Sequence, residues 1–432
     1  MSCKCKVPPV WRILIGFVLG MALGLAAPKC LGANATEAAL KFVAPFGSVL
    51  VSMLKMVVYP IIFFSLILGA ASLPLKKSGR VGGSVIVWYF ATSLFATVFG
   101  VAMAFLMNPS VRAASATASQ YLEGAKAMAG NSGAASLGEF FVNLFQNPFA
   151  SLAGGHFLPI IIFSILCGFS ARHLLDAMPE SEQEGSAIGL LVRVCDGAQK
   201  VSFKLIDWVM LYFPIGVFAL TFSNFAQHGA LLFGPYLRIV VCVTVGVLAM
   251  ILVVYPLAII AFCRENPYRL IARLRQPILT AFVTRSSAAT LPVSFNAMNE
   301  IGVSRSLSSF SLPLGATINM DGVCVHLPVF VILAANMFGL SLNVGQIAFL
   351  VVSIMFASVG AGGVPGGSVF LLFMVLENMG LEPDQVATTV ALALGINPIL
   401  DMFETSCNVT GDNVCTYIVA KKSGLVGAGE RN

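Results

Sequence analysis

Charged residues are scarce in this sequence. Asp, Glu, Lys and Arg make up only 10% of the 432 residues, whereas soluble domains carry about 25%. Hydrophobic residues reach 58%, and the mean hydropathy is +0.90. This composition excludes a soluble globule, a disordered chain and a nucleic-acid-binding protein. At about 20 apolar residues per membrane-spanning helix, the chain has room for roughly eight to ten spans, so it is predicted to be a polytopic membrane protein.

Patterns that indicate an enzyme or a metal centre are also missing. The ten cysteines are scattered, without the spacing of a zinc site or a disulfide framework. No HExxH or Ser/His/Asp arrangement supports a membrane protease. The glycines of 360–367 resemble a phosphate cradle, but no Lys-Ser/Thr follows them, so we expect no nucleotide site.

The net charge of +6 comes from short basic clusters between apolar runs. They lie at residues 4–12, 76–80, 264–275 and 421–422, and the positive-inside rule assigns such clusters to cytoplasmic loops. If the N-terminus is cytoplasmic, the later clusters follow two, six and eight spans and all return to the same side. We therefore expect both termini in the cytoplasm.

The first apolar run, residues 13–27, could be taken for a signal peptide because its flank is basic. It carries Gly16, Gly20 and Gly24 on one helical face, a pattern that allows close helix packing in lipid. We interpret it as a retained first helix.

Two segments in the C-terminal third are too rich in small residues for a continuous spanning helix. Residues 284–292 (TRSSAATLP) precede a helix that carries Asn-Met-Asp-Gly at 319–322, and residues 357–367 (ASVGAGGVPGG) precede one that carries 401–412. Irregular backbone at membrane depth is tolerated where it lines a protected cavity, and paired broken elements indicate a transporter's binding site. We predict two re-entrant hairpins related as an inverted repeat.

The polar residues of 401–412 are candidates for a buried binding face. Asp401, Thr405, Asn408 and Asp412 are spaced by four, three and four, which places them on one side of a helix, with Glu404 beside them. The alternative is a solvated amphipathic face, which the flanking apolar runs disfavour. Ionisable residues within a membrane segment are functional candidates by default.

Three further polar positions have less specific interpretations. The Asn-Met-Asp-Gly motif suggests a local unwinding that frees carbonyl oxygens for a hard cation such as Na+, although Asp321 could instead be a structural helix breaker. Arg285 could pair with a membrane carboxylate, meet an anionic substrate group or reach water. His326 lies on an apolar helix, and we expect a satisfied core histidine rather than a proton relay.

Five ordered motifs resemble the dicarboxylate/amino acid:cation symporter family, which includes the glutamate transporters. They are KMVVYPIIFFSLILGAASL (55–73), TRSSAATLP (284–292), LPLGATINMDG (312–322), SVGAGGVPGG (358–367) and NVTGD (408–412). The resemblance covers nearly the whole chain. It implies an all-α fold of eight transmembrane helices plus two re-entrant hairpins, assembled as a homotrimer surrounded by membrane lipid, in the bacterial inner membrane.

The resemblance also implies an elevator mechanism, in which a transport part moves as a rigid body against a scaffold. The scaffold would comprise residues 1–83 and 109–231, and the transport part residues 84–108 and 232–432. Three sodium sites are implied. Their residues are Gly315, Asn319, Asn408 and Asp412 for the first; Thr317, Ser358, Val359 and Ala361 for the second; and Tyr89, Thr92, Ser93, Asn319 and Asp321 for the third.

The substrate pocket implied by the resemblance departs from that of acidic amino acid carriers. Its residues would be Arg285, Ser286, Ser287, Val323, Val364, Ser368, Asp401, Glu404, Thr405 and Asn408. Glu404 stands where those carriers have an Arg, Val323 where they have a Thr, and Asn397 where they have an Asp. A carboxylate side chain facing Glu404 would be repelled rather than bound by a bidentate pair.

The pattern D-x-x-E-T-x-x-N at residues 401–408 resembles most closely that of the sodium:serine/threonine symporters of the family. We expect Glu404 to accept a hydrogen bond from a substrate hydroxyl, with its charge partly balanced by Arg285. The alternatives are a cationic or another neutral amino acid, an acidic amino acid or dicarboxylate, or a ligand-gated ion channel. Leu327 occupies the place of a Glu found in proton- and potassium-coupled relatives, so neither coupling is expected.

Overall fold

The computed structural model describes residues 9–71, 79–108, 145–154, 157–359 and 366–427. Within these ranges the chain is almost entirely helical, and β pairing is limited to one isolated bridge between Val303 and Val426. The predicted all-α class is confirmed. The helices in chain order are α1 (Pro9–Cys30), α2 (Gly32–Ala71), α3 (Gly79–Met107), α6 (Pro148–Gly154), α7 (Phe157–Asp176), α8 (Glu180–Gln183), α9 (Ala187–His228), the 3₁₀ turn η1 (Gly229–Leu232), α10 (Phe233–Ala249), the π-helical turn η2 (Met250–Val254), α11 (Tyr255–Cys263), α12 (Pro267–Arg273), α13 (Arg275–Thr284), α14 (Ser287–Ile301), α15 (Arg305–Ile318), α16 (Asp321–Phe338), α17 (Val344–Ser358), α18 (Gly367–Asn378) and α19 (Pro383–Lys422).

Six helical stretches in the described ranges are long and apolar enough to cross a membrane by length and composition. They are Trp11–Cys30, Val81–Met107, Pro159–Asp176, Ala187–Gln227, Tyr236–Cys263 and Arg305–Phe338. Large hydrophobic side chains remain exposed along α1, α3, α9 and α10, as expected of helices that face lipid rather than water. The number of eight spans stays a prediction.

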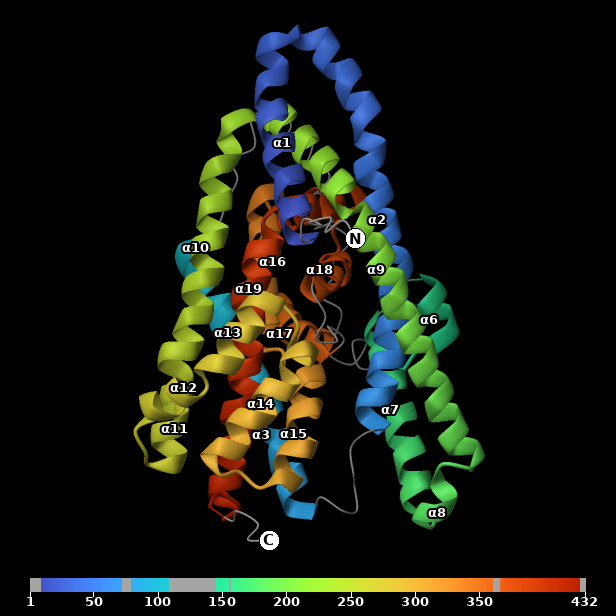
Figure 1. Cartoon of the computed structure of the whole chain (residues 1–432). Coiled ribbons are helices and arrows are strands. Elements are labelled where there is room, and N and C mark those ends of the chain that lie inside the picture. The colour runs from blue at the N-terminus through green and yellow to red at the C-terminus, as the bar shows by residue number, and fades with distance from the viewer. Residues whose placement is uncertain (1–8, 72–78, 109–144, 155–156, 360–365, 428–432) are drawn as a thin grey trace, which may run out of the picture.

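The helices pack in two groups. α1, α2, α7 and α9 pack mainly on one another, whereas α3 and α10 to α19 make most of their contacts among themselves. Figure 1 shows α2, α7 and α9 along one side and α10 to α12 along the other, with α13 to α19 between them.

Glycines bring α1 and α9 into backbone contact. A Cβ on Gly16, Gly20 or Gly24 would lie only 2.5–2.7 Å from a backbone oxygen of α9. Any larger residue would therefore push the two helices apart. The close packing predicted from this spacing is confirmed.

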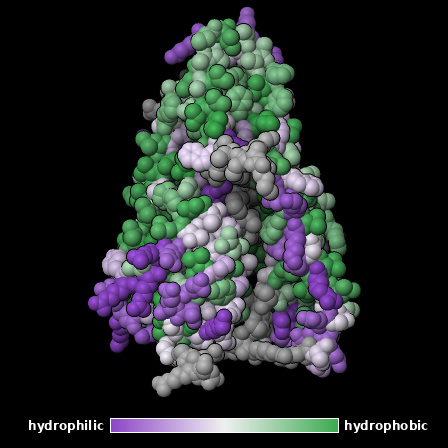
Figure 2. All heavy atoms as spheres, viewed as in Figure 1, coloured by the Kyte–Doolittle hydropathy of each residue, from purple (hydrophilic) through white to green (hydrophobic). Residues whose placement is uncertain are grey.

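The hydrophilic residues of the visible face gather mainly toward the end that carries α8, α11 and α12 (Figure 2). The loop after α11 meets the last turn of α19 there, because Nζ of Lys421 lies 2.5 Å from Oε1 of Glu265. Two of the predicted basic clusters, 264–275 and 421–422, therefore lie at the same end of the molecule.

α16 is the centre of the second group. Every residue from Asp321 to Ala335 is buried, because α3, α10, α17, α18 and α19 surround the helix. A helix that is buried all round can hold polar side chains only where its neighbours supply hydrogen-bond partners. These partners form the candidate site.

Candidate functional site

The polar centre of the molecule lies where one long hydrophobic segment is interrupted. α15 ends just before Asn319 and α16 begins at Asp321, so the two residues between these helices leave the helical conformation. Both Asn319 and Asp321 are fully buried. The backbone N–H of Gly322 donates to Oδ1 of Asn408 on α19, at 2.7 Å. The predicted unwinding of this motif is confirmed.

Two other helices donate hydrogen bonds to the Asp321 carboxylate. Oγ of Ser93 on α3 lies 2.9 Å from Oδ1, and the Tyr255 hydroxyl lies 2.7 Å from Oδ2. Tyr255 directly follows the π-helical turn η2, a local feature frequent at functional sites. Oγ1 of Thr92 donates to Oδ1 of Asn319, at 3.1 Å, so α3 contacts both Asn319 and Asp321.

The Asp412 carboxylate on α19 approaches the same break from the other side. Nδ2 of Asn319 donates to Oδ1 of Asp412, at 3.0 Å. A Cβ on Gly315 would lie 2.6 Å from that oxygen and 2.8 Å from the Tyr89 hydroxyl, so these side chains are neighbours. The structure thus brings together residues of the first and third predicted cation sets, which share Asn319.

The second predicted cation set is not assembled in this way. Oγ1 of Thr317 donates within its own helix to the Leu314 carbonyl, and Oγ of Ser358 donates to the Met355 carbonyl. In the described part of the chain, no hydrogen bond joins Thr317 to Ser358 or Val359. Ala361 lies outside the described residues.

The polar stripe of α19 is buried as expected. Asp401, Glu404, Thr405, Asn408 and Asp412 are each at most 4% exposed, which excludes a solvated amphipathic face. Carboxylates buried to this degree require compensating charges or hydrogen bonds.

Asp401 lies between the ends of two helix pairs. Nη1 of Arg285, the residue that joins α13 to α14, is 3.5 Å from Oδ2 of Asp401. The backbone N–H of Gly366, which precedes α18, donates to the same oxygen at 3.0 Å. Arg285 adopts the left-handed conformation with φ 54°, and Ser286 then caps α14. The break predicted in 284–292 therefore falls at Arg285.

Glu404 has a different partner from the one expected. Its Oε2 lies 2.5 Å from Nδ1 of His326 on α16, and both side chains are nearly inaccessible. Arg285, which we expected to balance the charge of Glu404 in part, forms its ion pair with Asp401 instead. The close approach of the helices depends on Gly322, where a Cβ would lie 2.3 Å from the Glu404 carbonyl oxygen.

Several buried polar atoms around these carboxylates have no hydrogen-bond partner among the described residues. Buried groups without partners are rare, and these atoms are able to bind a polar ligand or a water molecule. These atoms are Ser287 Oγ, Ser368 Oγ, Arg285 Nε, Asn397 Oδ1 and His326 Nε2. Val323 is buried close by in the first turn of α16, and Val364 lies outside the described residues.

Tyr255 and the role of His326 were not predicted from the sequence. The expectation of a satisfied core histidine is half right, because Nδ1 is bound and Nε2 is not. The signal in both cases was a single polar ring within an apolar run. Such a signal does not name the partner on another helix.

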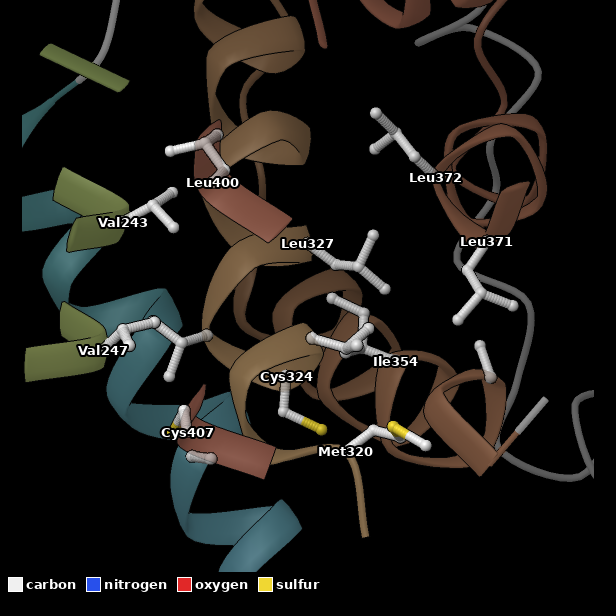
Figure 3. Close-up of a cluster of buried hydrophobic side chains, with 14 of the residues drawn as sticks. Val243, Val247, Met320, Cys324, Leu327, Ile354, Leu371, Leu372, Leu400 and Cys407 are labelled. Atoms are coloured by element: carbon white, nitrogen blue, oxygen red, sulfur yellow. The ribbon is translucent and has the colours of Figure 1, made fainter. Parts of the chain in front are cut away.

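Leu327 lies in an apolar cluster. Figure 3 shows its side chain pointing from α16 toward α18, which carries Leu371 and Leu372. All three residues are buried. The side chain at this position therefore contributes packing and carries no titratable group.

A family model described as "Sodium:dicarboxylate symporter family" matches residues 10–422. The human "Neutral amino acid transporter B(0)" is 31% identical to this chain, over 92% of the chain and 77% of the relative. The Escherichia coli "Proton/glutamate-aspartate symporter" is 30% identical, over 96% and 93% respectively. The Bifidobacterium adolescentis "Serine/threonine transporter SstT" is 29% identical, over 93% and 86%.

Proposed function

Because the chain belongs to the sodium:dicarboxylate symporter family, we propose that it is a sodium-coupled symporter of small neutral amino acids, of the serine/threonine type. It is an integral membrane transporter and not an enzyme. The single observation that carries the choice of substrate is the buried Glu404, at the position where the acidic amino acid carriers of the family have an Arg.

Glu404 disfavours acidic substrates by charge. Two unit charges about 4 Å apart at an effective dielectric of about 20 interact by roughly 4 kcal/mol. A substrate carboxylate next to Glu404 would meet that repulsion. A cationic side chain is disfavoured for another reason, since Asp401 already faces Arg285 and Glu404 already faces His326.

A neutral substrate suits the remaining polar groups. The α-carboxylate would bind the Ser287 hydroxyl and Asn408, and the ammonium group would bind Asp401 and Thr405. A side-chain hydroxyl would then donate to Glu404. This arrangement gives a partner to Ser287 Oγ, which has none among the described residues.

The two oxygen-rich groups at the helix break support sodium coupling. Na+ is a hard cation that prefers oxygen ligands. Asp321 lies beside the hydroxyls of Ser93 and Tyr255, and Asp412 lies beside the side-chain amide of Asn319. We propose sites at both, and a third at Thr317, Ser358, Val359 and Ala361. With three Na+ per zwitterion, the membrane potential would supply about 7 kcal/mol per 100 mV.

Transport would proceed by an elevator movement within a homotrimer in the bacterial inner membrane, with both termini cytoplasmic. The scaffold would consist of 1–83 and 109–231, and the moving part of 84–108 and 232–432. The two packing groups of helices support this division. The two helix pairs α13–α14 and α17–α18 would be the re-entrant hairpins, with the second as the gate.

The deciding experiment is uptake of labelled L-serine into proteoliposomes, with and without an inward Na+ gradient. We expect Na+-driven accumulation that excess aspartate and excess lysine do not inhibit. Accumulation of aspartate or lysine instead of serine would overturn the substrate assignment. Flux without accumulation above equilibrium would indicate a ligand-gated channel.

A further inference from the structure

The His326–Glu404 pair is the shortest polar contact that either residue makes among the described residues. Nδ1 of His326 lies 2.5 Å from Oε2 of Glu404, and the side chains are 2% and 4% exposed. An ionised carboxylate oxygen can only accept, so the His326 tautomer with hydrogen on Nδ1 is the one that forms this hydrogen bond with it. A hydrogen bond to a charged acceptor is about twice as strong as one between neutral groups, so this contact fixes the orientation of the Glu404 carboxylate.

The other donors around the pocket bind other carboxylates, so the imidazole of His326 is the group that compensates Glu404. The guanidinium of Arg285 faces Asp401, which also accepts the N–H of Gly366. Ser93 and Tyr255 donate to Asp321. Among the described residues, His326 is the one hydrogen-bond donor to the Glu404 side chain, and Oε1 receives no hydrogen bond.

Resting on the function proposed above, we propose that His326 is a positioning and selectivity residue of the substrate pocket. It binds one oxygen of Glu404, offsets the carboxylate charge and leaves Oε1 to accept the hydroxyl of the substrate. The pocket then favours a neutral hydroxylated side chain. Without the imidazole, Glu404 is a buried and uncompensated carboxylate, which a cationic side chain of the substrate would neutralise.

Two substitutions separate the hydrogen bond from simple packing. His326→Gln keeps an N–H donor but cannot carry a positive charge, and His326→Phe keeps an aromatic ring beside Phe330, whose ring centroid is 4.9 Å from that of His326, but has no donor. In proteoliposomes we expect His326→Phe to raise the KM for serine at least tenfold and His326→Gln to raise it less. The maximal rate and the Na+ dependence should change less than twofold, because the cation groups are left intact.

Substrate selectivity is the readout that a packing role would not move. Excess lysine should inhibit serine uptake by both variants and should not inhibit the parent. Combining His326→Gln with Glu404→Gln should abolish the lysine inhibition, and the double variant should be no weaker for serine than His326→Gln alone, since residues acting as one unit are not additive. The matched control is His173→Gln, at an exposed histidine of α7, which should behave as the parent does.

The outcomes distinguish the two proposals. If the parent accumulates serine and both His326 variants keep its KM and its insensitivity to lysine, this inference is wrong and the proposed function stands. If the parent accumulates no neutral amino acid with Na+, the proposed function itself fails. Should His326→Phe not fold, as judged by size-exclusion chromatography, lysine inhibition of His326→Gln alone decides the inference.

Discussion

Glycines bring two pairs of helices into backbone contact, but different side chains surround the two contacts. α1 and α9 meet through Gly16, Gly20 and Gly24, whose missing side chains let the backbones touch. α16 and α19 also approach through a glycine, Gly322, but polar side chains flank that contact. Lipid supplies little hydrophobic drive between helices, so close backbone packing holds the first interface. The second contains buried ionisable groups, which are expensive in a membrane and therefore indicate function. Substitutions should affect stability at the first interface and transport at the second.

The largest effect is expected from Gly20→Leu in α1. The new side chain would start 2.6 Å from a backbone oxygen of α9, and backbone cannot yield as a flexible side chain does. Overpacking costs typically about 1–3 kcal/mol, and occasionally more, and we expect the upper end here. Thermal unfolding of the purified protein in detergent measures the effect.

The control lies on the partner helix. A Cβ at Gly197 of α9 meets nothing within 4 Å, so Gly197→Ala should be neutral or stabilise the protein by up to about 1 kcal/mol through helix propensity. Equal unfolding temperatures for Gly20→Leu and the parent would contradict the backbone contact between α1 and α9.

The next effect concerns substrate charge at the second interface. Glu404→Arg with Val323→Thr replaces repulsion of an acidic side chain by a charge-assisted pair. We expect the preference between aspartate and serine to reverse, with a change in the ratio of their uptake efficiencies of at least 100-fold, or about 2.7 kcal/mol. Competition uptake in proteoliposomes measures this ratio. An unchanged preference for serine would show that Glu404 does not contact the side chain of the substrate.

A smaller effect is expected at the proposed cation group around Asp412. Asp412→Asn removes the carboxylate that accepts from Asn319 and keeps the size of the side chain. We expect the Na+ concentration for half-maximal uptake to rise about tenfold, or about 1.4 kcal/mol. Asp196→Asn, at an exposed ion pair of α9, is the control and should leave it unchanged. The same Na+ dependence in both variants would rule out this site.

The smallest effect is expected outside both interfaces, at the loop after α11. Hydrogen bonds from Lys421 and Tyr417 lower the pKa of Glu265 below its ordinary value of 4.5. A depressed pKa means that the ionised carboxylate stabilises the fold above the ordinary pKa, and that this stabilisation is lost as the pH falls below it. Because the pair is more than one third exposed, Glu265→Gln should destabilise by less than about 1 kcal/mol at pH 7.

At pH 4 the difference in stability between Glu265→Gln and the parent should be smaller than at pH 7. Glu37→Gln is the matched control, because Glu37 pairs with Lys41 within α2 alone, whereas Glu265 connects the loop after α11 to α19. Thermal unfolding of the parent and of both variants at pH 4 and at pH 7 measures these differences. A larger difference at pH 4 than at pH 7 would be incompatible with a lowered pKa of Glu265.

The sequence predicted local features well because their causes are local. The glycines at 16, 20 and 24 give one helix face without side chains, and this face allows close packing against whichever helix lies next to it. The break at 319–322 follows from a glycine and two polar residues in an apolar helix, and the burial of the 401–412 stripe follows from the apolar runs around it. The break at Arg285 needed no tertiary information either.

The hydrogen-bond and ion-pair partners of the buried side chains were less predictable. The spacing of residues along a helix shows which of them share a face, but it does not show which other helix packs against that face. Arg285 and Glu404 carry opposite charges and are suited to each other by charge alone, yet Arg285 reaches Asp401, and Glu404 meets His326 on α16. Tyr255 reaches Asp321 from a helix far away in the sequence, directly after a π-helical turn. No motif within α10 or α11 predicts that contact.

Hydropathy and backbone preference act over one or two helical turns, so the amino-acid sequence was enough to predict a helical membrane transporter, a break at 319–322 and the burial of the 401–412 stripe. The pairing of the buried charges came from the fold. Pairing depends on a few tenths of a nanometre between helices distant in the chain, and in a medium of low dielectric that distance decides whether a carboxylate is compensated.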